Sequence, residues 1–342
     1  MITAQEIEYI RKKLKGSVRP LFFFDDDPDG VSSFVQLYKY VGDGKGVCVK
    51  GKPVLEQKYA KKVEEFGPDL VIILDKPLVE QEFIDSITQE IIWIDHHPLQ
   101  NNKGVKYFNP RKENPEDNTP TSYWVYQIVK EENPEFLWIA MLGIVGDWNL
   151  LLESEFRQKY PELLPETANT PDKALFNSKL GSLIKIVDFN LKGSTTEVMK
   201  SIKTLTRIED PLEIINQTTS RGKFLYKKYL SVNKKYEELL NQVKIDDEKL
   251  LVFRYHESNL AISSQLSNEL LFKYPDKIII VIREKSGELM MSIRSGKQNV
   301  LKPLQEALKK TNGYGGGHDK ACGACIKTTD YDSFIDEFKK NI

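Results

Sequence analysis

The chain has 342 residues, of which 40% are hydrophobic and 29% are charged, and its formal net charge at pH 7 is −1. This length suits two domains with separate cores, and the near-neutral charge excludes a global field that would attract polyanions. No apolar run approaches the roughly 20 residues that cross a bilayer, and no signal-peptide pattern opens the chain. We therefore expect a cytoplasmic protein without a membrane partner, in which a nucleic-acid substrate would need a local basic patch or bound metal.

The first half of the chain alternates between short strand patterns and amphipathic helix patterns, after a predicted helix at 2–16. The alternation runs through strand 20–25, helix 31–41, strand 46–50, helix 56–66, strand 70–74, helix 78–87 and strand 90–94. This order is typical of a doubly wound, mostly parallel α/β sheet. Residues 99–118 are rich in Asn, Pro and Lys and predict a polar loop, after which helical patterning resumes at 121–129 and 134–146.

Residues 190–245 show helical patterning without strand patterns. One apolar stripe recurs there at helical spacing, at Leu225, Tyr229, Val232, Tyr236 and Leu239. The stretch also carries the basic residues Arg221, Lys223, Lys227, Lys228, Lys234 and Lys235. We interpret it as a connecting helix with a solvated basic face. The alternative is a surface that contacts phosphates, with the tyrosines stacked on bases.

A second α/β pattern completes the chain. It consists of strand 249–254, helix 258–273, strand 277–283, strand 288–294, helix 300–310, strand 321–327 and a short final helix. Glycines cluster at 313–317. These patterns predict three parts, namely a larger α/β domain at 1–190, a helical linker at 191–245 and a smaller α/β domain at 246–342.

The three cysteines, Cys48, Cys322 and Cys325, do not make a disulfide framework and are typical of a reducing compartment. Cys322 and Cys325 form a C-x-x-C pair without a second pair or a histidine at metal-ligand spacing. Because a lone pair is a weak signal, we do not favour zinc binding or redox chemistry here.

The most informative stretch is FFFDDDPDG, residues 22–30. Its three phenylalanines predict a buried strand, and the acidic cluster begins where that strand ends. The carboxyl end of a parallel strand lies in the usual ligand crevice of an α/β sheet. Asp25, Asp27 and Asp29 alternate, so an extended backbone would point their side chains one way. Like charges this close are costly unless they are neutralised, which a pair of divalent cations would do.

Three further motifs close apolar segments with acids or histidines. They are VIILDKP with Asp75, IIWIDHHP with Asp95, His96 and His97, and GIVGDWN with Asp147. A single aspartate at a strand end is commonly a helix cap or a turn residue. Because several strands deliver such residues to one edge of the predicted sheet, we predict a shared metal site.

These motifs resemble those of a known family. DDDPDG, the isolated Asp75, DHHP and the isolated Asp147 match, in order and spacing, the four motifs of the DHH phosphoesterase family. SIRS at 292–295 and GGGH at 315–318 resemble the DHH-associated C-terminal domain of RecJ-type nucleases and nano-RNases. The resemblance implies that the larger domain is catalytic and the smaller one binds substrate, with the active site in the cleft between them.

The resemblance also implies two divalent metal ions, with Mn²⁺ preferred and Mg²⁺ as the alternative. One ion would bind to Asp25, Asp27 and Asp75. The other would bind to Asp29, Asp75, His96 and Asp147, so that Asp75 bridges the two ions. Independently of the resemblance, hard carboxylate oxygens with one imidazole suit manganese.

Two remaining motif residues would act beside the metals. Asp95 would support the histidine pair and set its tautomers. His97 would face the scissile phosphate, where it would bind the phosphate or assist the leaving oxygen. Together with Asp75 and His96, these residues form the predicted catalytic set, and the metals would activate a water molecule.

The smaller domain would hold the substrate. Arg294 would form a bidentate hydrogen bond with phosphate oxygens, and Ser295 would add a hydroxyl donor. The other contacts would come from the close-approaching backbone of Gly315, Gly316 and Gly317 and from the side chain of His318.

The sequence departs from the family pattern in two places. Position 25 is Asp, where many members have His, which favours the RecJ subset. Lys76 and Pro77 follow Asp75, where the family often has a small residue, and Lys76 is a candidate for a substrate contact.

We therefore predict a RecJ-like phosphodiesterase that releases mononucleotides from single-stranded DNA or RNA, or from short oligonucleotides. One alternative is a hydrolase of a small phosphate compound, such as a cyclic or linear dinucleotide or 3′-phosphoadenosine 5′-phosphate. Another is a non-catalytic protein that binds single strands or a replication complex, although such proteins have lost metal ligands that this chain retains.

Overall fold

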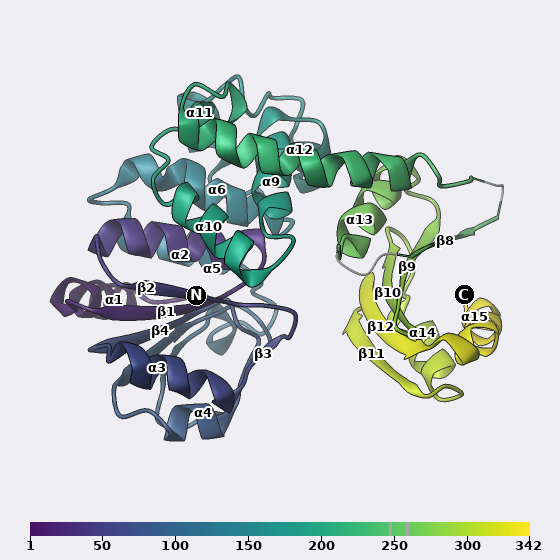
Figure 1. The fold of residues 1–342 in the computed structure, drawn as a ribbon, viewed down its shortest axis with the longest axis horizontal. Coiled ribbons are helices and arrows are strands. Elements are labelled where there is room, and N and C mark those ends of the chain that lie inside the picture. Colours follow the sequence, from purple (N-terminus) through teal and green to yellow (C-terminus); the bar gives the residue numbers. More distant parts are fainter. Residues whose placement is uncertain (246–247, 257–259) are drawn as a thin grey trace. The chain divides into compact units, whose positions relative to one another are not determined.

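A computed structural model of the chain describes residues 1–245, 248–256 and 260–342 (Figure 1). The chain forms two compact units, Met1–Tyr229 and Leu230–Ile342. Each unit has a hydrophobic core of its own around a five-stranded sheet. Two separate cores agree with what the length of the chain predicts.

The sheet of the N-terminal unit is parallel throughout, with strand order β2-β1-β4-β6-β7. Its strands are β1 (Pro20–Asp25), β2 (Lys45–Val49), β4 (Leu70–Leu74), β6 (Glu90–Ile94) and β7 (Lys106–Phe108). The central strands are apolar runs buried on both faces, as in a parallel sheet that helices cover on both sides. Phe24 pairs with Leu74, and Leu74 pairs with Ile94, so the residues that follow these three strands meet at one edge.

Each face of this sheet has its own helices. They are α2 (Pro28–Val41), α3 (Ala60–Phe66), α4 (Gln81–Asp85), α5 (Thr121–Val129) and α6 (Leu137–Gly146). Phe22 and Phe24 point into the core beneath α2, α5 and α6, whereas Phe23 points into the core beneath α3 and α4. Figure 1 shows α2 and α5 on one side of the sheet and α3 and α4 on the other. The predicted doubly wound α/β class is confirmed.

Further helices enlarge the N-terminal unit. They are α1 (Ala4–Gly16), α7 (Glu153–Lys159), α8 (Pro171–Phe176), α9 (Lys179–Asn190), α10 (Thr195–Leu205) and α11 (Leu212–Ile215). Short 3₁₀ helices lie at Gln57–Tyr59, Pro110–Lys112 and Pro134–Phe136. Because α10 and α11 contribute Val198 and Ile214 to the N-terminal core, this unit continues past residue 190. The assignment of separate catalytic, linker and substrate-binding parts stays a prediction.

Helix α12 (Ser220–Leu240) carries the predicted apolar stripe. Leu225, Tyr236 and Leu239 are buried, and Tyr229 and Val232 are half-buried. Lys228 does not fit the predicted solvated basic face. It is half-buried, and its Nζ donates to the carbonyl oxygen of Asn190 at 2.8 Å. Across the ranges that the structure describes, no helix combines the length and the apolar character that crossing a bilayer requires.

The C-terminal unit has a smaller mixed sheet with strand order β11-β12-β10-β9-β8, in which β8 and β9 are parallel and the other pairs antiparallel. Its strands are β8 (Leu250–His256), β9 (Ile278–Lys285), β10 (Glu288–Ser295), β11 (Gly313–His318) and β12 (Ala321–Lys327). Its helices are α13 (Ser263–Lys273), α14 (Leu301–Leu308) and α15 (Tyr331–Lys340), with a 3₁₀ turn at Thr328–Asp330. Ile280 and Met291 pack with Leu304 of α14 and Phe334 of α15, which cover one face of the sheet.

Two segments differ from the sequence predictions. The predicted loop at 99–118 contains β7, which pairs with the end of β6. The predicted helix at 78–87 begins with β5 (Leu78–Val79), which pairs with β3 (Val54–Leu55), and only then becomes α4. The glycines at 313–317, to which the sequence patterns assign no element, belong to β11, an edge strand. The predicted start of α13 at residue 258 lies outside the described residues.

Candidate metal centre

The centre begins where β1 turns into α2. Asp25 is the last residue of β1, and Asp27 is the N-cap of α2, where its Oδ1 accepts the backbone N–H of Gly30 at 2.9 Å. A Cβ atom at residue 30 would lie 2.7 Å from the backbone nitrogen of Asp25, so the turn is closed enough to require glycine. The tight turn therefore brings the acidic cluster to the carboxyl edge of the sheet.

Asp29 lies in the first turn of α2 and is only 2% exposed. Its carboxylate accepts the backbone N–H groups of Thr121 at 2.8 Å and Ser122 at 2.9 Å. These two N–H groups begin α5, where an anion is favoured by unpaired donors and by the helix dipole. The start of α5 therefore fixes the orientation of Asp29.

Asp75 follows β4 in a left-handed backbone conformation, with φ of 56°. Its backbone N–H continues the sheet by donating to the carbonyl oxygen of Ile94 at 2.9 Å. The hydroxyl of Thr121 donates to Asp75 Oδ1 at 3.2 Å. These contacts fix the carboxylate of Asp75, a residue that is only 1% exposed, at the end of a central strand.

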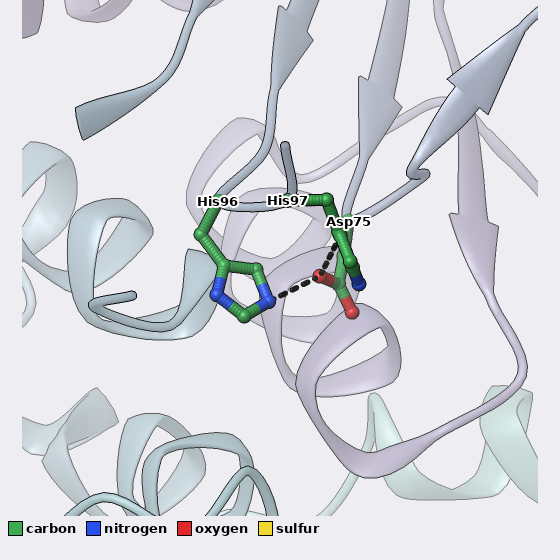
Figure 2. A group of neighbouring side chains, drawn as sticks. All are labelled: Asp75, His96 and His97. Atoms are coloured by element: carbon green, nitrogen blue, oxygen red, sulfur yellow. Dashed lines mark ion pairs between the residues drawn. The ribbon is translucent and has the colours of Figure 1, made fainter. Parts of the chain in front are cut away.

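His96 lies between two carboxylates, and Figure 2 shows its contact with one of them, Asp75. Its Nε2 lies 3.4 Å from Asp75 Oδ1 and 3.4 Å from Oδ2 of Asp147. Asp147 is the C-cap residue at the end of α6. His96 Nδ1 lies 3.2 Å from the carbonyl oxygen of Asn118, which can only accept a hydrogen bond. Nδ1 therefore carries a proton, and Nε2 is the ring atom that faces the carboxylates and would meet a metal ion.

His97 is held differently, by Asp95. Its Nδ1 lies 2.7 Å from Asp95 Oδ1, and its backbone N–H donates to Asp95 Oδ2 at 3.1 Å. Asp95 also accepts hydrogen bonds from the hydroxyl of Tyr107 at 3.0 Å and from the amide of Asn109 at 3.2 Å. Asp95 is thus fully buried and tied to β7, while His97 remains partly exposed.

Among the residues that the structure describes, two groups of side chains lie close enough to hold a metal ion, Asp29–His96–Asp147 and Asp75–His96–His97, each with its ligand atoms within 4.8 Å of one another. The predicted Asp25–Asp27–Asp75 set is not gathered within that distance. The second group uses Nδ1 of His97, 3.9 Å from Asp75 Oδ1 (Figure 2), but that nitrogen already pairs with Asp95. The first group offers two carboxylates and an available imidazole nitrogen. Its donor set fits a hard or borderline divalent cation such as Mg²⁺ or Mn²⁺.

The electrostatics of the cluster favour a cation. Burial, with Asp27 second, raises the pKa of Asp25 to about 7. Burial also raises the pKa of Asp147 to about 8 and that of Asp75 well above its ordinary value, with Asp29 adding to both. For His96 burial lowers the pKa, but the neighbouring carboxylates, Asp147 first, outweigh it and raise the pKa. Such a group of acids ionises fully only when positive charge enters the site.

Sequence reasoning missed several supporting residues. Lys76, a candidate for substrate contact, is instead fully buried, with its Nζ 3.1 Å from Asp25 Oδ1. Asn109 and Tyr107 orient Asp95, and Arg111 Nε donates to the carbonyl oxygen of His96 at 2.7 Å. For Tyr107, Asn109 and Arg111 the only sequence signal is their position shortly after the DHHP motif, inside the predicted loop at 99–118.

The predicted substrate-binding residues gather in the C-terminal unit. Arg294, on β10, donates to Asn268 Oδ1 at 2.8 Å, to Ser264 Oγ at 3.0 Å and to two backbone carbonyl oxygens. Ser295 is 3% exposed, and its Oγ accepts the backbone N–H of Gln298 at 3.0 Å. By contrast, every residue of β11, which includes Gly315, Gly316, Gly317 and His318, is exposed.

The C-x-x-C pair lies within β12, where a spacing of three places Cys322 and Cys325 on opposite faces of the strand. Cys322 packs in the core beneath α14, and its Sγ donates to the carbonyl oxygen of His318 at 3.1 Å. Burial raises the pKa of Cys322 to about 11. The two sulfur atoms therefore point to opposite faces of the strand and do not form a joint ligand pair.

Comparison with known proteins identifies the two units. The family model described as "DHH family, N-terminal domain" matches residues 21–145, and the model described as "DHHA1 domain" matches residues 247–342. No curated protein matches the chain by sequence. The first model contains every predicted metal-ligand position except Asp147, and the second contains all the predicted substrate-binding positions.

Solved structures share the fold across the whole chain. RecJ in complex with Mn²⁺ from Thermus thermophilus is similar with a TM-score of 0.69 at 13% identity, over 98% of this chain and 54% of that one. An exonuclease RecJ bound to manganese gives 0.63 at 13% identity, over 100% and 94%. The pGpG-specific phosphodiesterase PggH from Vibrio cholerae gives 0.52 at 14% identity, over 94% and 99%. This chain thus spans about half the length of the Thermus RecJ.

Proposed function

The chain belongs to the DHH family of phosphoesterases, with a DHHA1 domain in its C-terminal unit, and on this premise we propose that it is a metal-dependent phosphodiesterase that releases mononucleotides from single-stranded or very short nucleic acid. The observation that carries the proposal is the convergence of Asp29, Asp75, His96 and Asp147 at the carboxyl edge of the sheet. A RecJ that binds manganese has the same fold over the whole of this chain, which supports the proposal.

The ligand positions divide into two sets. Asp29, Asp75, His96 and Asp147 would hold one divalent cation. Asp25, Asp27 and Asp75 would hold the other, with Asp75 common to both. Two bound cations would supply an activated water molecule and neutralise charge that develops on the phosphate. Mn²⁺ suits the mixture of carboxylates and imidazole, and Mg²⁺ is the alternative.

The histidines have separate tasks in this proposal. The hydrogen bond from His96 Nδ1 to Asn118 leaves Nε2 free to act as a metal ligand. His97 keeps a proton on Nδ1 through Asp95, so its Nε2 is the atom that can meet a phosphate oxygen or the leaving oxygen. Asp95 sets the direction of the His97 ring. Its hydrogen bonds from Tyr107 and Asn109 keep it in place.

The C-terminal unit would bind the rest of the substrate. The exposed edge strand β11 would present the backbone N–H groups of Gly315, Gly316 and Gly317 and the imidazole of His318 to a phosphate or sugar. Arg294 already gives four of its five N–H donors to protein acceptors, so it would contact a phosphate through one Nη2 donor rather than through a bidentate hydrogen bond. Ser295 would shape the turn that follows β10, since its Oγ accepts backbone N–H groups there.

A second candidate is the hydrolysis of a small phosphate compound, such as a linear or cyclic dinucleotide. The observation that favours it is the fold shared with a pGpG-specific phosphodiesterase, which this chain matches over 99% of that protein's length. The chemistry at the metal centre would be the same in both candidates. The length of substrate that the C-terminal unit admits would separate them.

A time course with Mn²⁺ tests the proposal. A dimer, a pentamer and a thirty-nucleotide strand, each as RNA and as DNA and labelled at either end, would be followed by gel electrophoresis together with pGpG. Asp75→Ala should abolish cleavage, because it removes the shared ligand. Asp85→Ala, at an exposed residue of α4 in the same unit, is the matched control and should retain it.

Shortening of the long strand in single-nucleotide steps would support the exonuclease proposal. Cleavage of only the dimer and the pentamer would restrict the proposal to very short nucleic acid, and cleavage of pGpG alone would replace it with the second candidate. If the protein binds Mn²⁺ and cleaves none of these substrates, the enzyme proposal fails and a role in binding single strands remains.

A further inference from the structure

A buried lysine lies beside the metal centre. The side chain of Lys76 is 0% exposed, although lysine is among the residues that are most rarely buried. Its Nζ lies 3.1 Å from Asp25 Oδ1 and donates to the carbonyl oxygen of Lys52 at 2.9 Å. Its own carbonyl oxygen accepts the indole N–H of Trp93 at 3.0 Å. A buried ammonium needs such partners to offset its desolvation, so its position is built into the fold.

The contact with Asp25 is one-sided. The backbone N–H of Asp26 donates to the same oxygen, Oδ1, at 2.8 Å. Both donors thus occupy Oδ1, and Oδ2 is the oxygen of Asp25 that remains available to a metal ion. Lys76 therefore orients the carboxylate and at the same time cancels much of its negative charge.

The second ligand set, Asp29, Asp75, His96 and Asp147, has no comparable lysine or arginine among the described residues. Asp29 is held by backbone N–H groups, and Asp147 faces His96. Among the residues that the structure describes, no lysine or arginine forms an ion pair with Asp29 or Asp147. The positive charge of Lys76 therefore acts mainly on the set that contains Asp25, and the two sets differ in the charge that they offer to a metal.

We propose that the Lys76 ammonium lowers the affinity of the Asp25–Asp27–Asp75 set for a divalent ion and so makes the two metal positions unequal. The inference rests on the proposed two-metal function. Five aspartates, at positions 25, 27, 29, 75 and 147, carry five negative charges when ionised, which two divalent ions and one ammonium balance. The Asp25–Asp27–Asp75 set therefore binds its ion only after the other set is occupied, and it loses that ion first when the metal concentration falls.

Binding of Mn²⁺ measures this directly, without reference to activity. Free Mn²⁺ would be followed by electron paramagnetic resonance and heat by calorimetry, at one fixed pH. The wild-type protein should bind two ions in a strong and a weak step. Lys76→Met keeps the length of the side chain and removes the charge, so the weak step should tighten by roughly tenfold while the strong step stays unchanged.

Two further variants make the test specific. Lys76→Gln also removes the charge but retains a donor for the carbonyl oxygen of Lys52, and it should show the same tightening. Lys39→Met is the matched control, because Lys39 is a largely buried lysine whose Nζ meets Glu209 at 3.0 Å. It lies ten residues after Asp29 on α2, about 15 Å along the helix, so neither step should change.

The outcomes separate the two proposals. If the wild-type protein binds no Mn²⁺, the two-metal function itself fails. If it binds two ions and the weak step is unchanged or weaker in both Lys76 variants, the function stands and the role of Lys76 is overturned. Loss of the folded state in both variants, followed by circular dichroism with and without Mn²⁺, overturns it as well, because Lys76 would then be a structural residue.

Discussion

Gly143 of α6 lies directly against Asp29 of α2, so that a Cβ atom at residue 143 would stand 2.7 Å from Asp29 Oδ1 and closer still to Ser122 Oγ. Ser122 also supplies one of the two N–H groups that orient Asp29. The packing of α6 on α2 and α5 therefore also determines the position of Asp29, a proposed metal ligand. Glycine at 143 lets three helices meet around a buried carboxylate.

Gly143→Ala is expected to disturb the metal centre and the fold together. The added methyl group must push Asp29 or Ser122 aside, and overpacking of this kind costs about 1–3 kcal/mol of the free energy of unfolding. The affinity for Mn²⁺ should fall in parallel. Thermal unfolding and Mn²⁺ titration would measure the two effects. Gly16→Ala, where a Cβ atom meets nothing within 4 Å, is the control, and equal behaviour of the two variants would contradict the prediction.

The metal-free protein is expected to become less stable as the pH rises. Burial, the largest cause, raises the pKa of Asp25 to about 7 and that of Asp147 to about 8. The folded state then holds protons that the unfolded chain has released, so their contribution to stability is complete below about pH 4 and is lost as the pH passes through 7 and 8. Mn²⁺ should reverse the trend, because it binds the ionised carboxylates.

Thermal unfolding from pH 4 to 9, with a chelator and then with Mn²⁺, checks this prediction. Asp147→Asn removes one of the groups and should flatten the dependence in the metal-free protein. A metal-free protein whose unfolding temperature rises steadily from pH 5 to 8 would show that these carboxylates are not protonated in the folded state.

Asp95→Asn is expected to impair His97 while leaving the metal ligands in place. The amide oxygen of Asn can accept from one donor of His97, but its NH₂ group would face the donors of Tyr107 and Asn109. Loss of such a supporting contact costs about 10- to 100-fold in activity or metal affinity. Tyr107→Phe removes a single hydrogen bond and should have a smaller effect in the same direction.

Steady-state kinetics on the substrate that is cleaved would give kcat, and a separate titration would give the affinity for Mn²⁺. The two measurements separate an effect on catalysis from an effect on metal binding. The expected pattern is a fall in kcat that is larger than the fall in metal affinity. Unchanged kcat in Asp95→Asn would remove His97 from the proposed mechanism.

Two neighbouring glycines of β11 should behave differently. Gly317 has φ of 140°, and a Cβ atom there would lie 2.8 Å from the Cα atom of Cys322, whereas a Cβ atom at Gly316 meets nothing within 4 Å. Gly317→Ala should therefore destabilise the C-terminal unit by about 1–3 kcal/mol. Gly316→Ala should leave the unfolding temperature unchanged and raise KM, because the methyl group would stand where substrate approaches the exposed edge. An unchanged KM in Gly316→Ala would argue against β11 as a binding surface.

Much of the fold was predictable because its signals are local. Strands β1, β4, β6 and β12 were predicted with their observed bounds, since each is an apolar run between polar residues or glycines. The convergence of Asp75 and His96 followed from the rule that parallel strands share one carboxyl edge. Strand β7 escaped prediction because its three residues have no apolar run, and only pairing with β6 makes them a strand. Strand β11 escaped because glycine has low strand propensity, and its extended form comes from pairing with β12.

The sequence by itself determined which side chains carry acid or imidazole groups and where each strand ends, because apolar runs and side-chain periods are properties of short stretches. Only the tertiary structure decided which atoms meet. Asp29 receives its N–H groups from residues 92 and 93 positions away, and Asp25 receives an ammonium from Lys76, a residue whose burial no local pattern indicated. Such contacts join distant parts of the chain through a closely packed core, so they exist only after the helices and the sheet have assembled.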